Sequence, residues 1–465
     1  MTSHLRGVLR RRHISMIAMG GVIGAGLFVG SGSVIHQAGP VAVVAYLLAG
    51  VLVLLVMRML GEMAVAMPDT GSFSSYADRA IGRWAGFSIG WLYAWFWVVA
   101  LGIEATAGAI IIHRWTPDLP QWMLAFGLML VLSITNVVSV KFFGEFEYWF
   151  AGIKIAAIVI FLVLGALAIG GLLPGVTPPG ITNLFENGGF APNGLAAVVP
   201  ALLVVVFSFF GSEIATIAAG ESENPAAAVR SAVRAVVWRT LIFFVGSTFV
   251  IVTVVSWDSP AVQANPFVAV IESYGIPGAA VIMDVVVLVA VLSCLNSGIY
   301  TASRMLFSMA KRGEAPARLG TLTSTGNPRN AIIASSLVGF AIVALNYWFP
   351  EAVFLFLVSS AGAIALFVWL VVCVAQLRLR RHLERENRLP ATRMWLFPYL
   401  TYATIAAILG LIAGMAVLPE TRPALGASLV VAAAIVAIAL FRRRARNTTR
   451  NDSADDPRPA LSRSA

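Results

Sequence analysis

The sequence predicts an all-α membrane protein with twelve transmembrane helices. Of its 465 residues, 59% are hydrophobic and only 12% are charged, whereas a soluble domain carries about 25% charged residues. The apolar residues recur in runs of roughly 20, a length that crosses a bilayer as a helix. Two of these runs are interrupted by glycine. Together these features exclude a water-soluble fold.

The apolar runs define the expected spans. We place them at roughly 14–37, 41–66, 84–112, 121–140, 147–171, 193–220, 237–257, 278–309, 331–349, 353–377, 396–417 and 424–441. Three arginines precede the first run, as they would in an export signal. That run is about 20 residues long, lacks a cleavage site of small residues and is followed by similar runs. We therefore expect it to be a retained first helix.

Basic residues predict the orientation. With the N-terminus inside, the expected cytoplasmic segments hold 26 of the 32 Lys and Arg residues, and the external loops hold only Arg114 and Arg422. This asymmetry follows the positive-inside rule. Because the number of spans is even, both the tail 1–13 and the tail 442–465 should be cytoplasmic. The second tail is polar and should be disordered.

Several classes of function conflict with the sequence. The net charge of +10 lies in short clusters between spans, which favours topology signals over nucleic-acid binding. The two cysteines and five histidines are scattered, so we expect no disulfide, no metal and no cofactor. None of the three lysines follows a glycine, which rules out a nucleotide-binding P-loop. Energy for any transport would come from an ion gradient or from exchange.

The two interrupted runs stand five spans apart. Residues 20–32 (GGVIGAGLFVGSG) hold six glycines, and residues 207–213 (FSFFGSE) hold one beside aromatic residues. Close packing through small residues is the alternative, but six glycines fall on every face of a helix. Matching breaks predict an inverted repeat. We expect repeats at 14–171 and 193–377, with 396–441 outside them.

An unwound helix in a membrane exposes backbone groups, which is tolerated only where they line a cavity. Free N–H groups there suit a carboxylate, and free carbonyls suit an ammonium group. The two breaks could thus bind both ends of a small zwitterion.

Ionisable residues inside spans are expensive and therefore candidates for function. Glu104 lies midway along the third span, Lys154 lies in the fifth, and Glu213 follows the second break. A structural carboxyl or a helix cap is the alternative for the two acids. Glu221, at the cytoplasmic exit of the sixth span, fits a gate or a surface residue equally. Nearer the ends of spans are four residues that we expect to be structural: Glu62, Asp284, Arg58 and Arg304.

Five motifs carry a family resemblance. They are 57–66 (MRMLGEMAVA), 68–74 (PDTGSFS), 82–87 (GRWAGF), 293–304 (SCLNSGIYTASR) and 360–366 (SAGAIAL). With the first glycine-rich break, they resemble the amino acid transporter family of the amino acid–polyamine–organocation superfamily. The likeness extends over residues 5–440 and is greatest to the branch that carries 4-aminobutyrate (GABA).

This resemblance implies a LeuT-like 5+5 inverted repeat with two extra helices, in the bacterial plasma (inner) membrane. It also implies proton-coupled symport of GABA or a similar small amino acid. The implied substrate groups are the amides of Ala25 and Gly26, the carbonyls of Val22, Phe207 and Phe210, and their neighbours Ile23, Gly24, Gly211 and Glu104. Lys154 would replace the sodium ion of related transporters, and Glu213 and Glu221 would serve coupling or gating.

Other readings stay open. A broader amino acid permease or exchanger, for aromatic, cyclic or other neutral substrates, shares these motifs, and an enteric family member has serine at position 26. A membrane sensor would need a soluble output domain, and a membrane enzyme would need a catalytic constellation. The sequence offers neither, so we expect a transporter and not an enzyme. The oligomeric state is left open.

Overall fold

The computed structural model describes residues 22–67, 72–138, 140–213, 241–324, 326–349, 353–390 and 392–452. The regular structure in these residues is helical, without a strand. Eight helical segments are long and apolar enough to cross a membrane, and three shorter apolar helices accompany them. The predicted class, an all-helical membrane protein, is therefore confirmed. Eight long and three shorter segments, within the described residues, stand where twelve spans were predicted.

In the first half of the chain, the described residues begin with two short helices and continue mostly with long ones. Gly39, at a φ of 73°, ends the second short helix and Pro40 opens the next turn, a backbone that glycine adopts readily. The elements are α2 (Ala25–Phe28), α3 (Gly30–Ala38), η1 (Gly39–Val41), α4 (Ala42–Ala66), α5 (Ser72–Ala80), α6 (Arg83–Trp115), α7 (Gln121–Val138) and α8 (Val140–Ile169).

In the second half, the described residues form η2 (Thr182–Leu184), η3 (Leu195–Ala197), α9 (Val198–Phe209), an apolar helix at Leu241–Val254, α12 (Pro260–Ala264), α13 (Pro266–Ser273), α14 (Ala279–Lys311), η4 (Ala317–Gly320), α15 (Arg329–Trp348), α16 (Val353–Arg385), α17 (Tyr399–Val417) and α18 (Arg422–Asp452). The last helix continues past position 441, where the last span was expected to end. Residues 453–465 lie outside the described residues.

Three short helices, α5, α12 and α13, occupy segments between the predicted spans. Their start signals are local. Pro260 and Pro266 begin α12 and α13, a position where the missing N–H costs nothing. The side chain of Asn265 accepts a hydrogen bond from the amide of Val268 and so caps α13.

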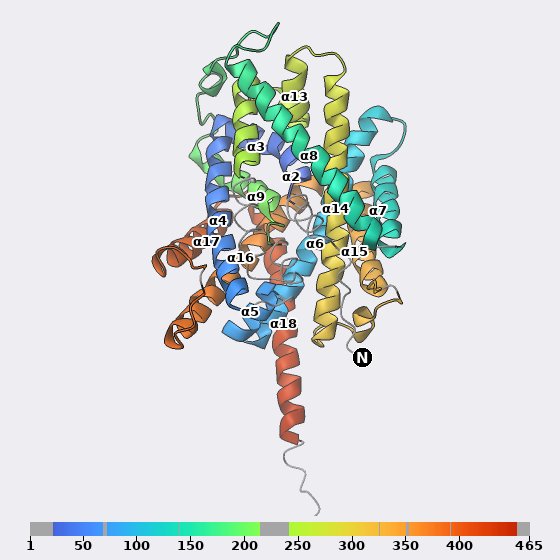
Figure 1. Ribbon diagram of the computed structural model, residues 1–465, viewed down its shortest axis with the longest axis vertical. Coiled ribbons are helices and arrows are strands. Elements are labelled where there is room, and N and C mark those ends of the chain that lie inside the picture. Colours follow the sequence, from blue (N-terminus) through green and yellow to red (C-terminus); the bar gives the residue numbers. More distant parts are fainter. Residues whose placement is uncertain are drawn as a thin grey trace, which may run out of the picture.

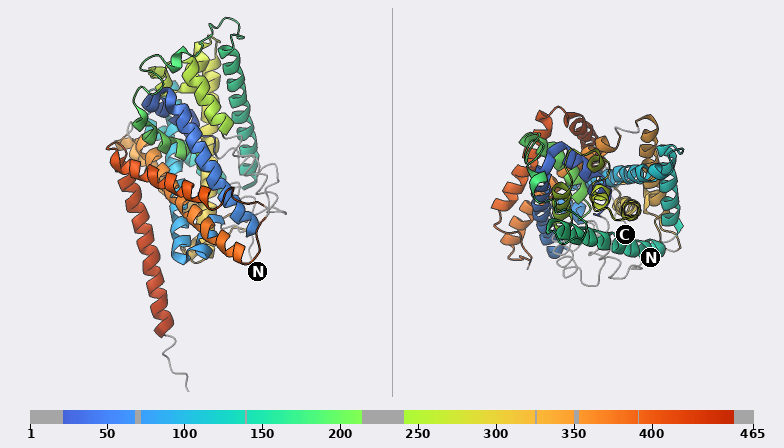
Figure 2. Two further views of the ribbon diagram at one scale, coloured as in Figure 1. Left: turned by 90° about the vertical axis from the view of Figure 1, so that its left-hand side faces the viewer. Right: turned by 90° about the horizontal axis from the view of Figure 1, so that it is seen from above.

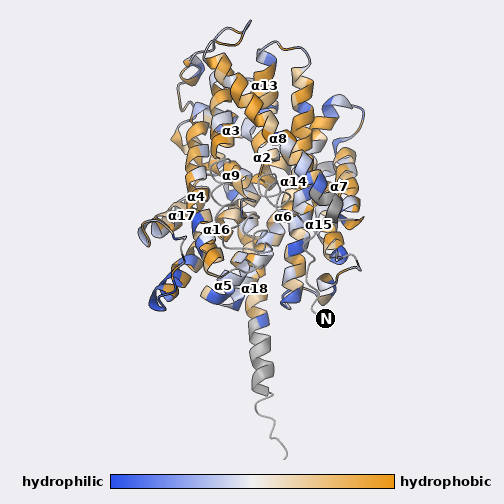
Figure 3. Ribbon diagram, in the orientation of Figure 1, coloured by the Kyte–Doolittle hydropathy of each residue, from blue (hydrophilic) through white to orange (hydrophobic). Residues whose placement is uncertain are grey.

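The long helix α6 lies at the centre of the bundle. In an apolar stretch of 18 residues in this helix, 83% of the stretch is buried inside the protein, whereas only 22% is buried in the corresponding stretches of α7, α17 and α18. It contacts α14, α16, α7, α5 and α15. The helices form one bundle, with α5 and the far end of α18 at one end and α13 at the other (Figures 1 and 2). Hydrophobic residues dominate the bundle, and hydrophilic ones gather at the end with α5 (Figure 3). Exposed apolar side chains on its outside, such as Trp149 and Val430, suit contact with lipid.

A buried ion pair joins α4 to α16 near the end that carries α5. Glu62 is 1% exposed, and its carboxylate accepts hydrogen bonds from Arg380 Nη1 at 2.7 Å, the Met394 amide at 2.7 Å and Gln376 Nε2 at 3.1 Å. Three partners satisfy the carboxylate, and so its burial is tolerated. The expectation that Glu62 is structural agrees with this network.

Replacing Glu62 with alanine should leave the Arg380 guanidinium buried without its counter-ion. Breaking a buried pair in this way costs about 3–5 kcal/mol, so the melting temperature of the purified protein in detergent should fall. Glu384→Ala is the control, because Glu384 also contacts Arg380, at 2.8 Å, but is 40% exposed. Equal melting temperatures of the two variants would contradict the structural role of Glu62.

Candidate functional site

The two glycine-interrupted segments lie beside each other in the middle of the bundle. Residues 22–24 are not helical, and α2 begins only at Ala25. The helix α9 ends at Phe209, where Phe210 is extended and Gly211 has a φ of 110°, a region that favours glycine. The helices α2 and α9 contact each other. Backbone groups of both breaks are therefore released at one place.

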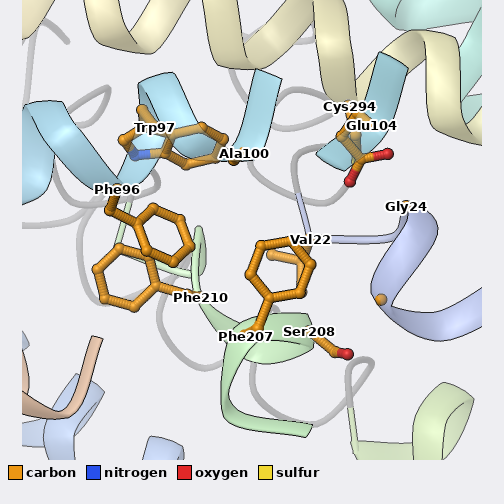
Figure 4. A pocket seen from close by; sticks show the side chains of 11 residues that line it. Val22, Gly24, Phe96, Trp97, Ala100, Glu104, Phe207, Ser208, Phe210 and Cys294 are labelled. Atoms are coloured by element: carbon orange, nitrogen blue, oxygen red, sulfur yellow. The ribbon is translucent and has the colours of Figure 1, made fainter. Parts of the chain in front are cut away.

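A cavity opens between these breaks and the helices α6 and α14. Phe96, Phe207 and Phe210 form its aromatic side, and Glu104 and Cys294 lie near Gly24 (Figure 4). The space that the centre of a water molecule can reach is only about 20 Å³. The lining residues are Val22, Gly24, Gly26, Phe96, Trp97, Ala100, Glu104, Phe207, Ser208, Phe210 and Cys294.

The aromatic side chains pack tightly on one another. The ring of Phe96 lies 3.9 Å from that of Phe210 and 5.8 Å from that of Phe207, between centroids. Phe210 also lies 5.8 Å from Trp369 of α16. The rings therefore fix one wall of the cavity and join α6, α9 and α16 around it.

Glu104 projects from α6 to the first break. Its Oε1 and Oε2 lie 3.3 and 3.1 Å from the amide nitrogen of Ala25, which donates to the carboxyl group. Glu104 is 6% exposed. The amide that was predicted to bind a substrate carboxylate thus binds a carboxyl group of the protein itself.

Glycine is required at two positions of the first break because neighbouring atoms come close. A Cβ at Gly24 would lie 2.5 Å from Cys294 Sγ and 2.6 Å from Glu104 Oε1. A Cβ at Gly26 would lie 2.8 Å from Ser208 Cα in α9, a backbone atom that cannot turn aside. The small residues let the two breaks meet.

Lys154 lies on α8 and is completely buried. Its Nζ donates to the carbonyl oxygen of Ile23 at 3.0 Å and to Ser293 Oγ of α14 at 2.9 Å. Cys294 Sγ also donates to the carbonyl of Ile23, at 3.2 Å. The lysine thereby joins the first break, α8 and α14, and the Ile23 carbonyl is held by protein donors.

The second break is held by its own chain. Glu213 Oε2 accepts from the Gly211 amide at 3.1 Å, and Ser212 Oγ donates to the Phe209 carbonyl at 2.9 Å. The Phe207 carbonyl, expected to hold an amino group, accepts from the Phe210 amide at 3.1 Å. Glu221, expected to serve coupling or gating, lies outside the described residues.

The structure brings most of the expected site residues together, and it adds others that the sequence analysis missed. Phe96, Trp97 and Ala100 stand eight, seven and four positions before Glu104 on one helix, so their shared face could have been found from helical spacing. Glu147 stands seven positions before Lys154 and accepts from Ser293 Oγ at 2.6 Å. Ser208 and Cys294 carry no comparable signal.

Comparisons with known proteins identify the family of the chain. The model of the amino acid permease family matches residues 13–447. The chain is 52% identical over 444 residues to gamma-aminobutyric acid permease of Bacillus subtilis, covering 95% of each protein. It is 49% identical over 405 residues to gamma-aminobutyric acid permease of Escherichia coli, covering 87% of each. It is 40% identical over 411 residues to the aromatic amino acid transport protein AroP of Corynebacterium glutamicum, covering 88% of this chain and 89% of that protein.

The chain therefore belongs to the amino acid permease family of the amino acid–polyamine–organocation superfamily. Members of this family are multi-pass membrane transporters and not enzymes, as the sequence predicted. The cavity between the two breaks is accordingly a candidate site for an amino acid.

Replacing Gly26 with valine should separate the two breaks, because its Cβ meets the backbone of Ser208. We expect substrate affinity to fall at least about tenfold, equivalent to about 1.4 kcal/mol, while the protein still reaches the membrane. Scintillation proximity binding of a labelled amino acid measures this. Gly127→Val in α7 is the control, because a Cβ there meets no atom within 4 Å. Unchanged affinity in Gly26→Val would remove the first break from the site.

Proposed function

We propose that this permease imports GABA or a similar small amino acid across the bacterial inner membrane, driven by the inward proton gradient. The observation that carries the proposal is the contact between the Ala25 amide and the Glu104 carboxyl group, at 3.1–3.3 Å. An amide already engaged by a carboxylate suits the carboxylate of an amino acid. Glu104 holds the place of the substrate and yields it on binding.

The size of the cavity supports this exchange. One water needs about 10–15 Å³ of such space, so the roughly 20 Å³ among the described residues holds little more than one water. An amino acid enters only if a lining side chain moves. Withdrawal of Glu104 from Ala25 frees both the volume and the amide. The carbonyl of Val22, on the other side of Gly24, is the proposed partner of the substrate amino group.

GABA is favoured because two relatives at about 50% identity are named gamma-aminobutyric acid permeases. A broader amino acid permease or exchanger is the second candidate. The aromatic wall of Phe96, Phe207 and Phe210 and the 40% identity to an aromatic amino acid transport protein favour it. The two candidates differ in the size of substrate that the wall admits.

The proposed architecture is a LeuT-like 5+5 inverted repeat of twelve spans, with repeats at 14–171 and 193–377, two extra helices at 396–441 and both termini in the cytoplasm. The contact between α2 and α9 supports it, because breaks at matching places of inverted repeats meet at the centre of such transporters. The basic residues of the predicted inner loops support the orientation.

Lys154 is the proposed coupling residue. Its ammonium group ties the Ile23 carbonyl to Ser293, and a charged donor binds such acceptors about twice as strongly as a neutral one. Loss of its proton weakens this tie and favours a state in which the first break moves. Glu213 and Glu221 remain proposed participants in coupling or gating, together with Glu104.

Replacing Phe207 with alanine should enlarge the cavity, because this ring packs 5.8 Å from Phe96. We expect larger amino acids to compete better with labelled GABA, by about tenfold for an aromatic amino acid. The reason is that one methylene group more or less in a hydrophobic pocket changes the binding free energy by about 1–3 kcal/mol. Phe126→Ala, at a side chain 45% exposed on α7, is the control. A fixed range of competitors, with lower stability alone, would assign Phe207 to packing.

Uptake into proteoliposomes should need an inward proton gradient, ignore sodium and collapse with a protonophore. One pH unit is worth about 1.4 kcal/mol per proton, so one coupled proton supports an accumulation of about tenfold per unit. Lys154→Ala should lose accumulation more severely than it loses binding.

The matched control for this variant is Lys311→Ala, at an exposed lysine that ends α14. Uptake that depends on sodium, or a Lys154→Ala protein that still concentrates substrate, would contradict proton coupling through this lysine.

A further inference from the structure

Beyond the proposed roles, a second buried carboxyl group faces Lys154 from its own helix. Glu147 lies two turns before Lys154 on α8, and both side chains are completely buried. They share one partner, the hydroxyl of Ser293 on α14. Lys154 Nζ donates to Ser293 Oγ at 2.9 Å, and Ser293 Oγ donates to Glu147 Oε1 at 2.6 Å. The three groups form one continuous hydrogen-bonded chain.

At least two carboxyl groups interact with the one ammonium group of Lys154. The titratable groups that interact with Lys154 include Glu104 of α6, Glu147 of α8 and Cys294 of α14. One ammonium faces two carboxyl groups, so two ionised carboxylates would leave a buried net negative charge, which is costly. A neutral cluster holds one proton more than the ammonium group does.

We propose that Glu147 is the acceptor for the proton of Lys154, and that the Ser293 hydroxyl passes it on. One N–H bond of the ammonium breaks as an O–H bond forms at Ser293 Oγ. The original O–H bond of Ser293 breaks as a new one forms at Glu147 Oε1. The products are a neutral amine, an unchanged hydroxyl and a carboxylic acid, so no charge is gained or lost.

This transfer acts directly on the first break. The amine that remains donates more weakly to the Ile23 carbonyl than the ammonium does, so α8 releases the break without a proton first crossing to water. The carboxyl group of Glu147 also interacts with Asn296 and Ser297 of α14, so it faces the same stretch of α14 as Lys154 does.

The inference rests on the proposed proton coupling and is tested by Glu147→Gln. The amide oxygen of glutamine still accepts from Ser293 but cannot take up the proton. A merely structural role would therefore survive, whereas proton transfer would not. The full-length protein is reconstituted into vesicles of phosphatidylethanolamine and phosphatidylglycerol. Uphill uptake of labelled GABA under an imposed pH gradient and counterflow exchange are then measured side by side, at several pH values.

We expect Glu147→Gln to exchange GABA within about threefold of the wild type, while its uphill accumulation falls to that of an uncoupled carrier and its uptake loses its pH dependence. Glu147→Asp, which keeps a carboxyl group, should recover part of the accumulation. Glu145→Gln, two positions earlier on α8 and partly exposed, is the matched control and should behave as the wild type.

A Glu147→Gln protein that accumulates GABA like the wild type, with the same pH profile, would overturn the inference alone. Wild-type uptake that ignores the pH gradient would instead contradict the proposed coupling. Should Glu147→Gln fail to reach the membrane, Ser293→Ala replaces it, since it removes the connecting hydroxyl and leaves both charged residues. Normal accumulation in Ser293→Ala would then overturn the proposal, and lost accumulation with retained exchange would support it.

Discussion

A backbone interrupted inside a membrane must find partners for its freed polar groups, because lipid offers none. At the first break, the Ala25 amide is bound by Glu104 and the Ile23 carbonyl by Lys154. These partners come from α6 and α8, which lie far away in the sequence. Two ionisable side chains thus satisfy backbone groups that the first break releases.

In our proposal two of these contacts can be exchanged, and they act on neighbouring residues. A substrate carboxylate would compete with Glu104 for the Ala25 amide, and the proton on Lys154 would set the strength of its bond to the Ile23 carbonyl. In our account both equilibria bias the position of one short segment. Ligands that bias a shared element affect each other's binding reciprocally. Coupling between amino acid and proton then needs no direct contact between them.

The apolar helices and the two breaks could be predicted from the sequence, because hydropathy and glycine content determine them locally, whereas the short helices α5, α12 and α13 lie outside the predicted spans. The partner of each freed group could not, because pairing between helices depends on how they pack. Glu147 illustrates the difference. The sequence predicts that the fifth span begins at Glu147, because Lys141 and Glu145 lower the hydropathy of the residues before it. Those residues are nevertheless helical, and α8 begins at Val140. Glu147 consequently lies two turns inside the helix. Likewise, Glu104 was expected in the site, but its occupation of the Ala25 amide is visible only in the fold.

The central claim is that the Ala25 amide exchanges a carboxyl group of the protein for that of the substrate. The most direct measurement is a rotational-echo double-resonance NMR experiment on the reconstituted protein, between the ¹³C-labelled carboxylate of bound GABA and the ¹⁵N amide of Ala25. When GABA binds, we predict a dipolar coupling between its ¹³C carboxylate and the ¹⁵N amide of Ala25 that corresponds to a hydrogen-bonded pair. At the same time, the coupling between the Ala25 amide and a ¹³C-labelled Glu104 carboxyl carbon should be lost. Bound GABA without coupling to Ala25, or a contact to Glu104 that persists unchanged, would contradict it.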